Sequence, residues 1–304
     1  MNTAVSSLPR GARLQWRSDA VVGWLLLLPA AVLLVAFTHY PAVATLWHSF
    51  FTTPKGARPA RFIGLDQYRA MADDPVFWTA LTNNLLYAAG TIVPAVALAM
   101  GMALWVNGKL AGRGALRLAY FTPTVLPMIA VANIWLYFYT PSYGLLDQIR
   151  GLFGMPAYNW LGSPDTVLWC VMLVSIWKEA GFFMIFYLAA LQQMPPELRE
   201  AAELEGASRW QFFRRVTFPL LMPTTLFVFV NAVVNAFRLV DHIVVMTRGG
   251  PDNASNLLLY YIYETGFKFW DGGYAAALTV VLLVILAAIA VLQFVVLERR
   301  THYQ

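Results

Sequence analysis

The chain has 304 residues, of which 59% are hydrophobic and only 12% are charged, and its mean hydropathy is +0.59. This composition leaves too little polar surface to cover a water-soluble globule, so it excludes a soluble protein and indicates an integral membrane protein. The net charge of +5 is modest, and in a membrane protein basic residues report orientation and not nucleic-acid binding.

Six apolar runs follow one another along the chain, and each is long enough to cross about 30 Å of hydrocarbon as a helix of roughly 20 residues. The first covers residues 21–37 and continues weakly to residue 51, with a kink expected near Pro41. The others cover residues 85–106, 118–146 (with its helix ending near Thr140-Pro141), 166–191, 220–246 and 274–297. We therefore expect an all-α integral membrane protein with six transmembrane helices.

Polar segments separate these runs. We expect a cytoplasmic N-terminal segment at 1–20, a six-helix transmembrane domain at 21–297 that includes a charged loop at 195–219, and a cytoplasmic tail at 298–304. The longer connections lie at 52–80, 141–165 and 247–273. Within the last of these, the apolar stretch 257–263 is expected to pack on the membrane surface.

Orientation follows from the distribution of Lys and Arg. The segments on the N-terminal side carry 12 of these residues, whereas the longer segments on the opposite side carry 7. Basic residues accumulate on the cytoplasmic side, so both termini and the loop at 195–219 are expected to be cytoplasmic. The chain is therefore expected to cross the membrane several times.

The loop at 195–219 is an island of charge in an apolar chain. Eight of the 19 residues from 197 to 215 are charged, so this segment must lie in water. Pro195-Pro196 suits the start of a helix, and Gly206 is expected to end it. Ser208 followed by Gln211 is a capping-box pattern that predicts a second short helix leading to Pro219.

The spacing within this loop carries a family resemblance. Glu200-Ala201-Ala202 is followed after three residues by Gly206, and after nine more by Val216-Thr217-Phe218-Pro219. This pattern resembles the EAA loop of permease subunits of bacterial type I ABC importers, with Glu205 in place of the usual Asp and with Val216 and Phe218 in place of Ile and Leu. In that family the loop is the coupling helix that the ATPase subunit holds.

Shorter segments extend the resemblance to nearly all residues from about 20 to 304. Those similar to the sugar-permease branch are Tyr40-Pro41, residues 64–68, Asn83-Asn84, Trp177-Lys178, and residues 237–241, 249–251 and 260–267. The ending at 297–304 is similar to the membrane subunit of glycerol-3-phosphate importers. The resemblance implies the type I importer permease fold and a sugar or sugar-like solute, with glycerol-3-phosphate or a related glycerophosphodiester favoured and di- or oligosaccharides as the alternative.

The resemblance also implies a location in the bacterial cytoplasmic (inner) membrane, and it implies partners. They are a second homologous permease subunit, two ATP-binding subunits and an extracytoplasmic solute-binding protein, all working in the lipid bilayer and without nucleic acid. ATP and Mg would be bound by the partner subunits, so no cofactor or metal is expected in this chain. The residues implied for contact with the ATPase are Glu200, Ala201, Ala202, Glu203, Gly206 and Pro219.

Polar groups inside the apolar runs are costly and are candidates for the translocation path. The substrate-pathway candidates are Lys178, Tyr187, Asn231, Asn235, Arg238 and Asp241. Arg238 and Asp241, three residues apart, can pair on one helix face. With His242 added, the residues at 231, 235 and 238 form a stripe at helical spacing, which would either line the path or bond to neighbouring helices.

Enzymatic motifs are absent from the sequence. Gly108-Lys109 lacks the earlier glycine of a phosphate-binding loop, and neither H-E-x-x-H nor G-x-S-x-G occurs. The single cysteine, Cys170, excludes an intrachain disulfide or a cysteine-rich metal site. We therefore expect a transport subunit and not an enzyme. The rival hypothesis is an ion-coupled secondary carrier, with Lys178, Glu179, Arg238 and Asp241 as its relay.

Overall fold

The computed structural model describes residues 10–56, 58–108 and 112–298. The elements in this part of the chain are helices, in the order α1 (Arg10–Leu34), η1 (Val35–His39), α2 (Tyr40–His48), α3 (Asp66–Ala72), α4 (Pro75–Asn107), α5 (Arg113–Val125), α6 (Met128–Tyr139), α7 (Leu145–Leu152), α8 (Pro164–Gln192), α9 (Glu197–Leu204), α10 (Arg209–Phe212), η2 (Phe213–Thr217), α11 (Phe218–Arg238), α12 (Asp241–Met246), α13 (Leu258–Tyr263), η3 (Glu264–Lys268) and α14 (Gly272–Glu298). The three η elements are single π-helical turns. Residues 1–9 of the predicted N-terminal segment, Lys109, and residues 299–304 of the predicted tail lie outside the described residues.

The predicted membrane spans are confirmed as helices. Within the described residues, five helical segments are long and apolar enough to cross a bilayer, and the bent pair α5–α6 brings the number to six. Local chemistry sets several of their starts. For α4, Pro75 occupies the first turn, where its missing N–H costs nothing, and the Asp74 carboxylate accepts a hydrogen bond from the Val76 N–H at 2.9 Å.

The centre of the bundle is the packing of α4 against α8. Small side chains make this possible: Ala88, Ala95, Ala99 and Ala103 are all buried along α4 at helical spacing. Small residues let helix backbones approach closely, and packing of this kind drives helix association in a bilayer, where water supplies no hydrophobic force. Helix α11 packs on α4 and α8, α5 packs on α8, α12 packs on α6, and α2 and α13 pack on α14.

The third predicted span is not one helix. One helix from residue 118 to about Thr140 was expected, but the chain breaks at Leu126 and Pro127, and the two halves α5 and α6 are bent by 102°. Proline at 127 cannot donate a backbone hydrogen bond, and the residue before a proline is pushed towards extended backbone; the ψ of Leu126 is 135°. The expected end near Thr140 is confirmed, because α6 stops at Tyr139.

The fifth predicted span, 220–246, lies within one helical segment, Arg209–Met246, that is long and apolar enough to cross a bilayer. Its helix is interrupted, because α11 ends at Arg238, and after an irregular Leu239-Val240 the chain resumes as α12. The stretch 257–263, which was expected to pack on the membrane surface, packs on other helices of the protein. Leu258 and Tyr260 are fully buried against the bundle, where α13 packs on α14 and α4.

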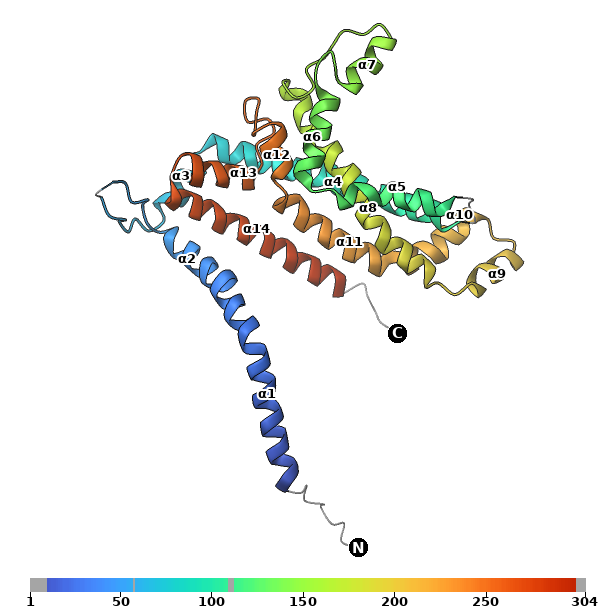
Figure 1. Ribbon diagram of the computed structural model, residues 1–304, viewed down its shortest axis with the longest axis horizontal. Coiled ribbons are helices and arrows are strands. Elements are labelled where there is room, and N and C mark those ends of the chain that lie inside the picture. The colour runs from blue at the N-terminus through green and yellow to red at the C-terminus, as the bar shows by residue number, and fades with distance from the viewer. Residues whose placement is uncertain (1–9, 57, 109–111, 299–304) are drawn as a thin grey trace.

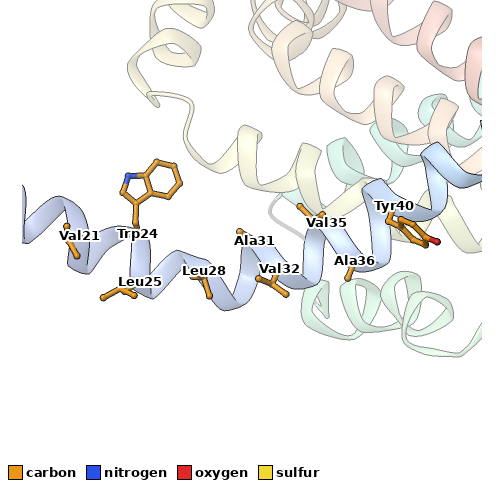
Figure 2. Close-up of a pocket in the computed structure, with 9 residues that line it drawn as sticks. All are labelled: Val21, Trp24, Leu25, Leu28, Ala31, Val32, Val35, Ala36 and Tyr40. Carbon is orange, nitrogen blue, oxygen red and sulfur yellow. The ribbon is translucent and has the colours of Figure 1, made fainter.

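The first span stands apart from the other helices. Figure 1 shows α1 leaving the bundle, while α2 lies along α14. A shallow hollow runs along one side of α1, and Figure 2 shows that its lining comes from this span alone: Val21, Trp24, Leu25, Leu28, Ala31, Val32, Val35, Ala36 and Tyr40. Because the lining is almost wholly apolar and no second element closes it, the hollow is an apolar helix surface and not a solute site.

Candidate functional site

The loop at 195–219 folds as the sequence predicts. Helix α9 ends at Leu204, and Gly206 follows with a left-handed φ of +71°. The Ala207 N–H donates to the Ala202 carbonyl at 2.9 Å, and the Gly206 N–H donates to the Glu203 carbonyl at 3.1 Å. This pair of bonds is a Schellman motif, which satisfies the last carbonyls of the helix and turns the chain sharply.

The second half of the loop joins the membrane without a break. The Ser208 hydroxyl accepts from the Gln211 N–H, and the Gln211 side chain accepts in return from the Ser208 N–H, so the predicted capping box is present. Helix α10 then continues through η2 into α11, with Pro219 in the first turn of α11. The turn at Gly206 is thus connected to a membrane span through continuous helical backbone.

The surface of α9 is open to solvent. Glu200 and Ala201 are exposed, and so is Glu203, which forms an exposed ion pair with Arg199 at 3.0 Å. The apolar side chain of Leu204 is 89% exposed, just before the turn. In Figure 1, α9 and α10 lie at one end of the bundle, and α3 and α13 lie at the other.

The Lys178 ammonium is held by main-chain carbonyls of another part of the chain. Its ammonium donates to the main-chain carbonyls of Pro123 at 3.0 Å, Thr124 at 3.4 Å and Leu126 at 2.5 Å. These carbonyls lie at the break between α5 and α6. An ammonium has three N–H donors, and each has an acceptor here. The structure therefore places this pathway candidate at a helix end.

The neighbouring Glu179 faces a different helix. Its carboxylate lies near the Asn235 side chain on α11. Asn231, one turn earlier on α11, donates from its Nδ2 to the Phe227 carbonyl of its own helix at 2.8 Å. Glu179 and the two asparagines thus form a short polar strip between α8 and α11, and Glu179 was not among the sequence-based pathway candidates.

The expected pairing of Arg238 with Asp241 was wrong. Ion pairs in the described part of the chain join Arg69 to Asp66, Arg199 to Glu203 and Lys268 to Glu264, and none involves residue 238 or 241. The reason is the end of α11 at Arg238, since three-residue spacing brings side chains together only within a continuous helix. Both side chains are exposed.

The same helix end removes His242 from the predicted stripe. His242 is fully buried and stacks on Tyr87 of α4, with ring centroids 5.7 Å apart. The Tyr87 hydroxyl lies 3.0 Å from His242 Nε2 and 2.5 Å from the Ser175 hydroxyl of α8. This cluster joins three helices. Sequence reasoning missed it because Tyr87 and Ser175 are single residues in apolar runs, with no periodic partner.

Tyr187 is also buried inside the bundle. Its exposed fraction is 0%, and its hydroxyl lies near the Thr225 side chain of α11 without a well-formed hydrogen bond. In this conformation Tyr187 packs between α8 and α11 and does not line an open channel. Of the six pathway candidates, the structure therefore brings only Asn231 and Asn235 onto a shared polar strip, with Glu179.

A second ordered loop follows α6. The Asp147 carboxylate of α7 accepts hydrogen bonds from the Ser142 N–H at 2.9 Å, the Tyr158 N–H at 3.0 Å and the Trp160 indole N–H at 3.0 Å. The Arg150 guanidinium lies 5.5 Å and 5.4 Å from the rings of Tyr158 and Trp160. These contacts fold the segment between α6 and α8 around one carboxylate, and Figure 1 shows α7 standing off the bundle, far from α9.

Comparison with known proteins gives a consistent result. The model of a family described as binding-protein-dependent transport system inner membrane component matches residues 75–303. The sulfoquinovosyl glycerol transport system permease protein of Agrobacterium fabrum is 33% identical, with 90% of each chain covered. The trehalose/maltose transport system permease protein of Thermococcus litoralis is 30% identical, with 92% of this chain and 94% of that protein covered.

A third relative is the sn-glycerol-3-phosphate transport system permease protein of Agrobacterium fabrum, which is 30% identical and covers 94% of this chain and 97% of its own length. Among solved structures, a bacterial ABC transporter involved in the import of the acidic polysaccharide alginate contains a chain that superposes with a TM-score of 0.84. That chain is 24% identical, with 94% of this chain and 99% of its own length covered, so the likeness shows a shared fold.

Proposed function

This chain belongs to the family of binding-protein-dependent transport system inner membrane components, and from this premise we propose that it forms half of the translocation path of an ATP-driven importer for a sugar or sugar-like solute. It is a permease subunit of an ABC transporter and not an enzyme. Because the chain belongs to this family, the rival hypothesis of an ion-coupled secondary carrier is not retained. The observation that carries the proposal is the exposed helix α9, closed by a Schellman turn and continuous with α11.

In the proposed mechanism, an ATPase subunit holds α9 through Glu200, Ala201, Ala202 and Glu203, and ATP and Mg are bound by that subunit. Gly206 fixes the angle between α9 and α10, which we call the elbow. Movement of α9 then passes through α10 and η2 to Pro219 and α11. The spans then exchange between outward- and inward-facing states whose populations depend on the bound nucleotide. The exposed Leu204 would be covered in the contact.

The proposed assembly contains this chain, a second homologous permease, two ATP-binding subunits and an extracytoplasmic solute-binding protein. The excess of basic residues on the side of α9 supports an orientation with both termini in the cytoplasm. The ordered loop around Asp147 would then lie outside the cytoplasm, on the side from which solute arrives.

For the path itself, we assign solute contact to the polar strip of Asn231, Asn235 and Glu179. Amide and carboxylate groups can hydrogen-bond sugar hydroxyls. The exposed Arg238, which has no ion-pair partner in the described part of the chain, would attract an anionic solute. Lys178 is not proposed to contact solute, because its N–H donors already bond to main-chain carbonyls. Tyr187 is not proposed to contact solute either, because it is buried inside the bundle.

The favoured solute is glycerol-3-phosphate or a related glycerophosphodiester. Two of the relatives carry glycerol-containing solutes in their names, sulfoquinovosyl glycerol and sn-glycerol-3-phosphate. A guanidinium suits an anionic group on such a molecule. The trehalose/maltose relative supports a second candidate, a di- or oligosaccharide.

The mechanism is tested by reconstituting the chain with its partner permease, both ATP-binding subunits and the binding protein in lipid vesicles. Uptake should require ATP on the side of the vesicle membrane where the ATP-binding subunits lie. It should vanish when any partner is omitted. Transport by this chain alone that is insensitive to ATP would refute the proposal.

The solute is tested separately, by calorimetric titration of the cognate binding protein with glycerol-3-phosphate, a glycerophosphodiester and maltose. Binding of a phosphorylated glycerol supports the favoured candidate. Binding of maltose alone would replace it with the second candidate and leave the ATP-driven mechanism standing.

A further inference from the structure

The break in the third span leaves main-chain carbonyls without partners in their own helix. The last four carbonyls of an α-helix have no partner within that helix, and α5 ends inside the bundle just before the bend. Each unsatisfied backbone group in a bilayer costs several kcal/mol. A bend of 102° in a membrane span therefore needs donors from another element.

Lys178 supplies these donors from α8. Its ammonium meets the carbonyls of Pro123, Thr124 and Leu126, which lie on the last turn of α5 and on the linker itself. A cation at the C-terminal end of a helix is also favoured by the helix dipole. The three contacts define the direction in which the chain leaves α5.

Gly181 makes this approach possible. It lies one helical turn after Lys178 on α8, and a Cβ placed on it would come within 2.1 Å of the Tyr120 carbonyl of α5. Backbone and not a flexible side chain would be struck, so a larger residue would force α5 away from α8. Lys178 holds the end of α5 by hydrogen bonds, and Gly181 lets α5 approach α8 because it has no side chain.

The bend in turn positions α6. Helix α6 packs against α12, and the Trp135 ring of α6 meets the Trp177 ring of α8 edge to face at 5.7 Å. Trp177 directly precedes Lys178. A change in the bend would shift this aromatic contact and the helix α12 that follows the break at Arg238.

We propose that Lys178, together with Gly181, is a positioning residue for transport that locks the bent third span onto α8, so that α5, α6 and α8 move as one body during the cycle. This proposal rests on the proposed importer function. It assigns no solute contact to Lys178, in contrast to the role expected from the sequence. The residue acts on transport through the placement of α6.

The test compares Lys178→Met with Lys178→Arg in the reconstituted importer. Lys178→Met removes all donors, and we expect the maximal uptake rate to fall about tenfold or more while the KM for the loaded binding protein changes less than about twofold. ATP hydrolysis stimulated by the binding protein should fall in parallel. Lys178→Arg keeps N–H donors and should restore at least about half of the wild-type rate.

A rise in KM of about tenfold with the maximal rate retained, in either variant, would overturn the proposal and make Lys178 a solute ligand. Equal rates in wild type and Lys178→Met would also overturn it. If Lys178→Met fails to assemble with the ATP-binding subunits, the KM of Lys178→Arg decides between the two roles. Wild-type uptake in the same vesicles shows independently whether the importer function holds.

Gly181→Ala tests the contribution of Gly181 to holding α5 against α8, and Gly101→Ala on α4 is its matched control. A Cβ at Gly101 would meet nothing within 4 Å, so that variant should transport normally. Gly181→Ala should lower the maximal rate about as strongly as Lys178→Met, with the complex still assembled. Wild-type transport by Gly181→Ala would contradict the close approach on which the lock depends.

Discussion

Gly206 lies just past the end of α9 with a φ of +71°, and a Cβ built on it would meet nothing within 4 Å. The glycine is therefore required by its backbone conformation and not by space. A left-handed conformation costs an L-residue with a side chain about 1–2 kcal/mol, and asparagine tolerates it better than most residues do. Residue 206 thus offers a substitution that alters the elbow without any steric clash.

We expect Gly206→Val to reduce ATP-dependent uptake about tenfold or more, because the strained residue would reopen the Schellman turn and misdirect α9. Insertion into the membrane should be unaffected, since the spans do not contact this residue. Uptake in vesicles and the amount of chain in purified membranes measure the two effects. Gly206→Asn is the control, and normal uptake by the valine variant would contradict the role of the elbow.

Asp147 offers a test by pH. The hydrogen bond from the Ser142 N–H is the main reason why the pKa of this carboxyl is lowered; burial opposes it, and the Tyr158 and Trp160 donors and the Arg150 charge add to the lowering. Because the folded pKa lies below the ordinary value of about 4, the carboxylate stabilises the loop above that value. This contribution is lost as the pH falls through the lower, folded pKa.

Hydrogen exchange of residues 141–163 should therefore be constant from neutral pH down to about pH 5, after correction for intrinsic rates, and should accelerate below about pH 4. Asp147→Asn should show fast exchange already at neutral pH, because an amide cannot accept all three hydrogen bonds. A loop that is equally protected in wild type and variant at neutral pH would show that the carboxylate does not hold it.

At the scale of elements, the structure depends on polar contacts between helices that are distant in sequence. Asn84 of α4 is buried, donates to the Ala236 carbonyl of α11 at 3.3 Å and accepts from the Leu258 N–H at the start of α13 at 3.2 Å. Three elements meet at this one side chain. Asn133, in contrast, is exposed and bonds only to the Ile129 carbonyl of its own helix.

Asn84→Ala should lower the stability of the purified chain by about 1–3 kcal/mol, because it leaves a buried N–H and a buried carbonyl without partners. The thermal midpoint in detergent should fall by several degrees, while Asn133→Ala should leave it nearly unchanged. Equal midpoints for the two variants would mean that α11 and α13 are held in place by packing alone.

At the scale of the whole molecule, the distribution of basic residues and the proposed contact of α9 with an ATPase support the same orientation, with both termini in the cytoplasm. We expect a fluorescent protein to be active, and alkaline phosphatase to be inactive, when either is fused at residue 304 or inserted after residue 205. At residue 155, between α7 and α8, inserted alkaline phosphatase should be active and an inserted fluorescent protein inactive, because this position is expected to lie outside the cytoplasm. Alkaline phosphatase and a fluorescent protein distinguish the two compartments, and phosphatase activity at residue 304 would reverse the proposed topology.

The sequence by itself determined the class of protein, the positions of the spans and the local structure of the loop at 195–219. A span needs about 20 apolar residues whatever its neighbours are, and the Gly206 turn and the Ser208 capping box depend on residues close in the chain. The resemblance of this loop to the coupling loop of importer permeases added the expectation that it contacts an ATPase subunit.

Only the tertiary structure decided where the third span bends, where α11 ends and which partners the intramembrane polar groups choose. Lys178 finds carbonyls more than 50 residues earlier, and His242 finds Tyr87 and Ser175 on two other helices. Periodicity relates residues within one helix, whereas these contacts arise between helices. In a bilayer each polar group takes whichever partner the packing brings near, because no water is present to satisfy it.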